Sequence, residues 1–210
     1  MILKSGKSND NLIYGIGHSS NINPITFEGK KVKEYETWRG MLKRCCDEEY
    51  ISREPTYNGC TVSSEWLYYD NFYKWVTTQK NYPKWKNGQR WSIDKDIKYK
   101  GNKIYSSDTC FLVPQNVNGL FTNRKLHRGA LPIGVDYLKK LNKFRASCMN
   151  PFTGKQEHIG VYENTDEAFY AYKQYKENII KQVAEHEYLN GNITFECMNA
   201  MLKYNIEIND

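Results

Sequence analysis

The sequence predicts an α+β protein, in which helices and small antiparallel sheets occupy separate stretches of the chain. Apolar and aromatic residues recur at helical spacing in the first half of the chain, whereas three segments between residues 134 and 162 alternate apolar and polar side chains. A capped helical pattern follows the third of these segments at Asn164. These observations indicate a helical body with short strands, followed by a sheet that packs on one helix.

The N-terminal third predicts an arm and two helices. Residues 1–34 are rich in Gly, Asn and Ser and favour only short strands, around residues 12–16 and 25–27. The first helix carries an apolar stripe at the spacing i, i+3, i+4, i+7, formed by Trp38, Met41, Leu42 and Cys45. Ser64 is expected to cap a second helix. That helix would bury Trp66, Tyr69, Phe72, Tyr73 and Val76. Their helical spacing favours core packing over a platform for stacking nucleobases.

The stretch from residue 91 to residue 120 combines acidic and amide side chains with a short strand and a helix start. A strand ending at Ile93 is followed by an acidic cluster, a turn containing Gly101, a short polar stretch and an Asn-rich helix start. Hard oxygen ligands of this kind select Mg²⁺ or a similar ion, which can polarise a phosphate.

This order of features resembles the metal-finger core of HNH nucleases, whose pattern is an Asp-His pair, a central Asn and a last Asn or His. The resemblance implies that Asp94 and Asn118 hold Mg²⁺ or Mn²⁺, and that Asn102 orders the loop. Asp96 would share a face with Asp94 in an extended backbone and could support the ion without binding it directly. Lys95 stands where the family has the His that acts as general base.

The Lys at position 95 changes the chemistry that the site can perform. An unperturbed Lys is protonated near neutral pH and cannot accept a proton from water. Lys95 would then contact the scissile phosphate, or it marks a decayed site that binds DNA without cutting it.

The six cysteines show no C-x-x-C pair and no paired Cys/His spacing, so a zinc site is not expected. The chain also shows neither a signal peptide nor an apolar run long enough to span a bilayer. These features predict no membrane partner and a location in the cytoplasm, which is the host cytoplasm if the protein is phage-encoded.

The segments from residue 134 to residue 162 predict a sheet with two different faces. On the middle segment Phe144, Ala146 and Cys148 share one face, and Arg145, Ser147 and Met149 share the other. The third segment places Ile159 and Val161 opposite Gln156 and His158, with a less regular period. Asn164 can cap the following helix, with Glu167 as its capping-box partner. We expect the apolar face to pack on this helix and the basic face to stay open.

The charged residues are spread unevenly along a chain whose net charge is +6. Residues 79–105 and residues 124–161 each hold eight Lys/Arg against two Asp/Glu, whereas the residues from 162 onward hold four against nine. Two basic segments interleaved with aromatic residues favour a polyanion such as nucleic acid. For either segment alone, a solvated Lys-rich surface is the alternative.

The sheet segment resembles the AP2 domain, a three-stranded DNA-binding sheet packed on a helix. The matching stretches are Gly134-Val135, Lys143-Phe144-Arg145-Ala146, Ile159-Gly160-Val161-Tyr162, Glu167-Ala168 and Ala171-Tyr172. The resemblance implies that Arg145, Ser147, Gln156 and His158 touch DNA in the major groove. Lys139, Lys140 and Lys143 would contact phosphates at the groove edge. Arg128, in the basic linker, is expected along the phosphate backbone. The loop before Phe144 is longer than usual for the family, and Met149 replaces a residue that is commonly basic.

These predictions divide the chain into five parts and join them in one hypothesis. The parts are an N-terminal arm (1–34), an HNH-like nuclease domain (35–122), a basic linker (123–133), an AP2-like DNA-binding domain (134–185) and a C-terminal helical tail (186–210). The fold is an HNH-like ββα-metal finger core with helices, followed by a three-stranded antiparallel sheet on one helix.

The combined resemblance is to phage-type HNH homing endonucleases with an AP2-like domain, which hydrolyse phosphodiester bonds of double-stranded DNA. One alternative is a catalytically inactive DNA-binding regulator on the same fold. Another is a phage-type interaction protein that binds an acidic protein or a nucleotide. A homodimer formed through the apolar side of residues 195–204 also stays open.

Overall fold

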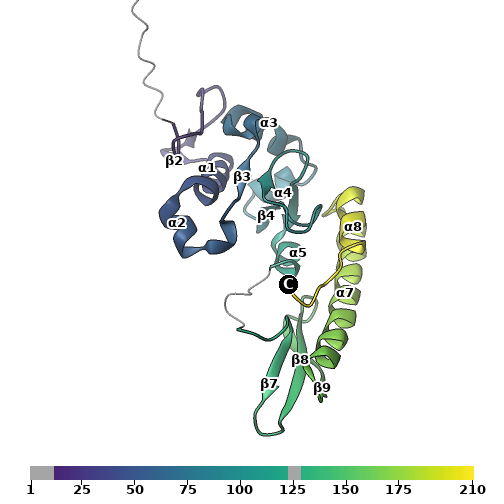
Figure 1. The fold of residues 1–210 in the computed structure, drawn as a ribbon. Coiled ribbons are helices and arrows are strands. Elements are labelled where there is room, and N and C mark those ends of the chain that lie inside the picture. Colours follow the sequence, from purple (N-terminus) through teal and green to yellow (C-terminus); the bar gives the residue numbers. More distant parts are fainter. Residues whose placement is uncertain (1–11, 123–128) are drawn as a thin grey trace, which may run out of the picture. The chain divides into compact units, whose positions relative to one another are not determined.

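A computed structural model describes residues 12–122 and 129–210 (Figure 1). It confirms the α+β class, because helices alternate with four small sheets. The chain forms two compact units. The first unit comprises Met1–Gln89 and Gly101–Cys110, and the second comprises Arg90–Lys100 and Phe111–Asp210. The chain therefore passes from the first unit to the second, back to the first, and then to the second again.

The first unit contains four α-helices and two small sheets within its described residues. Its helices are α1 (Lys33–Cys46), α2 (Glu48–Arg53), α3 (Tyr69–Thr78) and α4 (Tyr82–Lys86), with 3₁₀ turns η1 (Pro55–Tyr57) and η2 (Ser64–Leu67). Strand β1 (Thr26–Phe27) pairs antiparallel with β2 (Lys30–Lys31), and β3 (Thr61–Val62) pairs parallel with β5 (Ile104–Tyr105). The arm thus forms a two-residue hairpin at one of its two predicted strand positions.

The core of the first unit lies between α1 and α3. Trp38, Met41 and Leu42 are buried on the predicted stripe of α1, whereas Cys45 is only half-buried. The indole Nε1 of Trp38 donates a 2.7 Å hydrogen bond to the carbonyl of Trp66, which ties α1 to the turn before α3. This bond satisfies the one polar atom of a fully buried indole.

The prediction that Ser64 caps the second helix is wrong. Ser64 lies inside the 3₁₀ turn η2, and helix α3 starts only at Tyr69. Tyr68 between them has an extended backbone, and the N–H of Tyr69 donates to the carbonyl of His18 from the arm. A contact from a distant segment therefore replaces the hydrogen bond that would have continued a single helix. The predicted aromatic residues are nevertheless buried, except for Tyr73, which is half-buried.

The second unit consists of a strand–strand–helix element, a three-stranded sheet and two C-terminal helices. The first element comprises β4 (Trp91–Asp94), β6 (Phe111–Pro114) and α5 (Gln115–Leu120). The sheet comprises β7 (Val135–Leu138), β8 (Lys143–Asn150) and β9 (Lys155–Tyr162), antiparallel in the order β7-β8-β9. The helices are α7 (Thr165–Leu189) and α8 (Phe195–Leu202).

One apolar core joins these elements of the second unit. Ala146 and Cys148 of the sheet pack in it with Phe169 and Tyr172 of α7. Further core residues come from the strand–strand–helix element and from the C-terminal helices, among them Ile97, Val113, Val117, Ile180, Cys197 and Met201. Residues 90–100 and 111–120 therefore share a core with α7 and α8, whereas residues 101–110 belong to the first unit.

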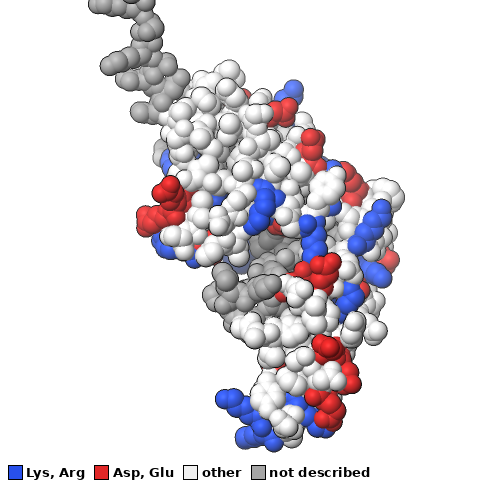
Figure 2. Space-filling model, in the orientation of Figure 1, with Lys and Arg blue, Asp and Glu red and all other residues white. Residues whose placement is uncertain are grey.

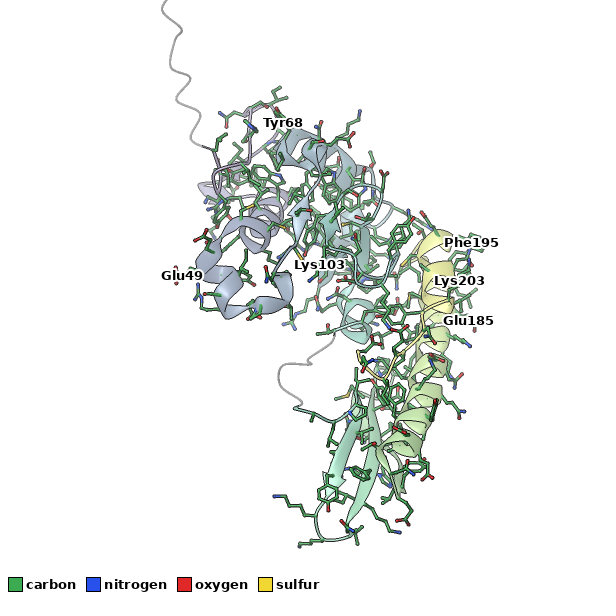
Figure 3. All side chains as sticks on the ribbon, in the orientation of Figure 1. Glu49, Tyr68, Lys103, Glu185, Phe195 and Lys203 are labelled. Carbon is green, nitrogen blue, oxygen red and sulfur yellow. The ribbon has the colours of Figure 1, made fainter. Side chains whose placement is uncertain are left out.

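Helix α7 begins where the sequence predicts and ends later. The side chain of Asn164 accepts a 2.9 Å hydrogen bond from the N–H of Glu167, as expected of a capping residue. The helix runs to Leu189, beyond the predicted boundary at 185, and α8 then packs against it. Thr194 caps α8, and Phe195 opens it at an exposed position (Figure 3).

A glycine fixes the approach of the sheet to α7. Gly134, directly before β7, has a φ of 76°, in the region that favours glycine. A Cβ at this position would lie 2.0 Å from Cδ2 of Tyr172 on α7. Position 134 thus excludes any side chain, both for its backbone and for its contact with the helix.

A β-bulge interrupts the pairing of β8 with β9. Ser147 pairs with His158, whereas the preceding Ala146 pairs with Gly160, so that Ile159 is the extra residue. Beyond the bulge, Val161 pairs with Arg145 and is exposed, while Ile159 packs on the core. The prediction that Ile159 and Val161 share one face is therefore wrong, since an extra residue reverses the alternation of side chains.

None of the helices in the described parts of the chain combines the length and the apolarity needed to cross a bilayer.

Candidate functional sites

The strand–strand–helix element carries the two predicted metal-binding residues on two different segments, Asp94 on β4 and Asn118 on α5. Asp94 is the last residue of β4 and pairs with Phe111, the first residue of the antiparallel β6. Helix α5 follows β6 directly and packs against β4. Its N-terminal residue Gln115 is held at the other end of β4, where its N–H donates to the carbonyl of Arg90.

The Asp94 carboxylate is buried and organises the loop after β4. Its Oδ1 accepts hydrogen bonds of 2.8 Å from the N–H groups of both Asp96 and Ile97. Burial, with the nearby negative charge of Asp96, raises the pKa of Asp94 to about 6. A carboxylate that ionises this close to neutrality, at the end of a strand, is typical of a functional site.

The Lys95 side chain is committed to an ion pair. Its Nζ lies 2.8 Å and 2.7 Å from the two carboxylate oxygens of Asp96, and the residue is buried. The geometry favours a cationic role for Lys95.

The two asparagines belong to different units. Asn102 lies in the first unit, where its side chain accepts from the N–H of Ile104 and donates to the carbonyl of the same residue at 2.7 Å. Asn118 lies in the second unit, half-buried on α5, next to the buried Val117. Asn116 on the same helix donates to Glu187 of α7 at 2.9 Å and anchors α5.

The Asp94 carboxylate is of the kind that a hard divalent cation accepts. A buried carboxylate with a raised pKa is stabilised by a nearby positive charge. Among the described residues no three His, Cys, Asp or Glu side chains gather into a metal-binding group. Any cation here would therefore depend on few protein ligands and on oxygens of water or substrate, as Mg²⁺ commonly does.

The sheet has one face packed on α7 and one face that we call the open sheet face. Cross-strand partners share a face, so the register defines its members. They are Asp136 and Leu138 of β7, Lys143, Arg145, Ser147 and Met149 of β8, and Gln156, His158 and Val161 of β9. The structure thus brings together the four residues that were predicted to touch bases, with Lys143 on the same face. Ser147 and His158 are direct partners, and Nε2 of Gln156 donates to Oγ of Ser147 at 3.0 Å.

The cations of the sheet lie on this face and at its end. Lys139 and Lys140 are exposed in the turn between β7 and β8, and blue side chains mark that end of the hairpin in Figure 2. Lys143 pairs with Glu163 at 2.6 Å. Arg145 binds Asp136 through both Nε (3.1 Å) and Nη2 (2.6 Å), and this contact raises the pKa of the guanidinium further.

Asp136 is a residue that sequence reasoning missed. Its contact with Arg145 depends on the pairing register of β7 with β8, which the alternation of side chains within one strand does not give. The other missed member is Val161, which the β-bulge turns outward. Arg128, the predicted phosphate contact of the linker, lies outside the described residues.

Comparison of the chain with protein-family models, curated proteins and solved structures found no match. The functional argument therefore rests on the two sites themselves: an open sheet face with exposed lysines in the turn at its end, and a buried acidic strand end.

Proposed function

We propose that the protein binds double-stranded DNA through the open sheet face of β7, β8 and β9. The observation that carries the proposal is the arrangement of Arg145, Ser147, Gln156 and His158 in two adjacent rows on the sheet face opposite the one that packs on α7. These side chains offer the donors and acceptors that distinguish base pairs in the major groove.

The shape of the second unit supports a groove-binding role for this face. The major groove is about 12 Å wide and admits a two-stranded ribbon. Strands β8 and β9 are each eight residues long, and α7 packs only on their other face. The exposed Lys139 and Lys140 extend beyond the strands, where they can contact phosphates without specifying sequence.

The ion pair between Arg145 and Asp136 does not oppose this role. Both side chains are nearly half exposed, and an exposed ion pair of this kind contributes little to stability because water screens it. Asp136 therefore orients the guanidinium at little cost, and one guanidinium nitrogen edge can still turn toward a base.

The direct test is binding of a short duplex over a salt series. Arg145→Ala should weaken binding at every salt concentration by about tenfold, which corresponds to the lost base contact. Replacing both Lys139 and Lys140 by Ala should lower the slope of log K against log salt by about 2, one unit per phosphate contact. Lys181→Ala, an exposed change on α7, is the matched control. Failure of the unaltered protein to bind any duplex in low salt would refute the proposal.

A second candidate function, phosphodiester hydrolysis, is favoured by the element β4–β6–α5. Its order of strand, strand and helix, with Asp94 ending the first strand, is that of the metal finger that the sequence resembles. Asp94 and Asn118 would hold Mg²⁺, which would polarise the phosphate when bound. The Lys95 ammonium, held by Asp96, would stabilise negative charge on the phosphate.

Asp94→Asn tests hydrolysis without removing the loop's hydrogen bonds, because the amide Oδ1 can still accept from Asp96 and Ile97. If the second function holds, Mg²⁺-dependent nicking of a plasmid falls at least a hundredfold in this variant, and Mn²⁺ binding measured by calorimetry weakens. If the unaltered protein binds duplex DNA but never nicks it, hydrolysis is refuted and DNA binding stays as the proposed function.

A further inference from the structure

Two apolar side chains are exposed on the open sheet face, whose other members are polar except for the half-buried Leu138. Met149 is 52% exposed and Val161 is 39% exposed. Single exposed apolar residues are common on protein surfaces. These two, however, each stand opposite a polar group capable of reading a base: Met149 pairs with Gln156, and Val161 pairs with Arg145.

Val161 reaches this face only through the β-bulge. With regular alternation, Val161 would share the core face with Ile159, and the outward position would fall to a neighbour. The extra residue at Ile159 instead directs Val161 outward beside Arg145. Bulges are frequent next to functional sites, where they re-aim side chains.

The chemistry of the major groove gives these apolar groups a partner. The thymine C5 methyl is the apolar feature of the groove edge, while guanine O6 and N7 bind Arg and adenine N6 and N7 bind Gln. In each mixed cross-strand pair, Arg145 with Val161 and Gln156 with Met149, the polar side chain can therefore bind a purine while the apolar side chain contacts an adjacent thymine methyl.

We propose that Met149 and Val161 are specificity-determining residues that each contact a thymine methyl group; this inference rests on the proposed binding of duplex DNA. Arg145 and Met149 are four residues apart on β8, which separates the two mixed pairs by roughly 13 Å. That distance is close to four base-pair steps of about 3.4 Å each. The two methyl contacts thus fall on different base pairs.

The test uses duplexes selected by the unaltered protein from a random pool, with each thymine then replaced singly by deoxyuridine. Deoxyuridine lacks only the C5 methyl group, so a lost contact should weaken binding about fourfold, equivalent to about 0.8 kcal/mol for one buried methyl. We expect such a loss at two positions. In Val161→Ser, which removes both methyl groups of the side chain, one of the two losses should vanish, and in Met149→Gln the other should vanish.

Leu189→Gln is the matched control, because Leu189 is exposed at the end of α7 and lies off the sheet. It should retain both losses. This inference is wrong if deoxyuridine weakens binding at no position. It is also wrong if both variants are weakened by deoxyuridine at the same two positions as the unaltered protein. Either outcome would leave the proposed DNA binding intact. Absence of any duplex selected from the pool would instead overturn the proposed function itself.

Discussion

Lys176 places an ammonium group in the interior of the second unit. The residue is 8% exposed on α7, and burial lowers the pKa of its amine, with the Cys148 thiol as a neighbouring group. It has no ion-pair partner among the residues that the structure describes. A buried charge without a counter-charge costs stability, because its hydration is lost and nothing replaces it.

Lys176→Met should therefore stabilise the protein at pH 7, by about 1 kcal/mol or more. The lowered pKa means that the folded state binds fewer protons than the unfolded state between the folded pKa and 10.5. The contribution of Lys176 to stability should consequently rise with pH in that window, so the stability advantage of the variant should be smaller at pH 9.5 than at pH 7. Urea denaturation at pH 7 and pH 9.5 measures both effects. Lys181→Met, on the exposed side of α7, should change stability by less than about 0.5 kcal/mol.

For individual residues, the sequence predicts which side chains are buried better than it predicts which side chains form ion pairs. The alternation along β8 correctly places Ala146 and Cys148 inside and Arg145 and Ser147 outside. It gives no information on the pairing of Arg145 with Asp136, or of Lys95 with Asp96, because these depend on register and loop geometry.

Among the elements, α7 depends on a single capping side chain at its start. Asn164 satisfies the N–H of Glu167 and precedes a first turn that also carries Asp166. Asn164→Ala should cost about 1 kcal/mol, whereas Asn164→Asp should cost little, since Asp caps equally well and its charge favours the helix N-terminus. Thermal denaturation of the two variants beside the unaltered protein checks this. Equal melting temperatures for the Ala and Asp variants would show that the cap contributes nothing.

The elements that the sequence misplaces are those in which a distant segment decides the outcome. The second helix starts at Tyr69 because the arm residue His18 binds its N–H. Val161 lies on the open sheet face because the β-bulge leaves Ile159 of β9 without a partner on β8. In contrast, the cap and start of α7 follow from neighbouring residues, and these were predicted correctly. A helix cap can be predicted from one segment of sequence, whereas the register of a sheet depends on how two strands pair.

At the scale of the whole molecule, buried cysteines report on each unit separately. Cys60 and Cys110 are buried in the first unit, and Cys148 and Cys197 in the second. Duplex DNA at a hundred times its Kd should stabilise the second unit by about 2.7 kcal/mol, if it binds the open sheet face. Pulsed alkylation during heating should then show protection of Cys148 and Cys197 to higher temperature.

The same measurement separates two kinds of unfolding. Cys60 and Cys110 should keep their original midpoint if the units unfold independently, and should move with Cys148 if they unfold together. A midpoint at Cys148 that DNA leaves unchanged contradicts binding by the second unit. A heparin control distinguishes binding of duplex from binding of any polyanion.

The passage of the chain between the units has a consequence for how such a protein can be made and altered. The strand β4 enters the second unit before residues 101–110 complete the first. During synthesis β4 can pair with β6 before the C-terminal helices are made. Ile97 in the same segment can be buried only after α7 and α8 are made, because residues of these helices belong to its core. No single cut in the polypeptide yields both units whole. Recombination at one point in a gene could therefore not exchange either compact unit as an intact module.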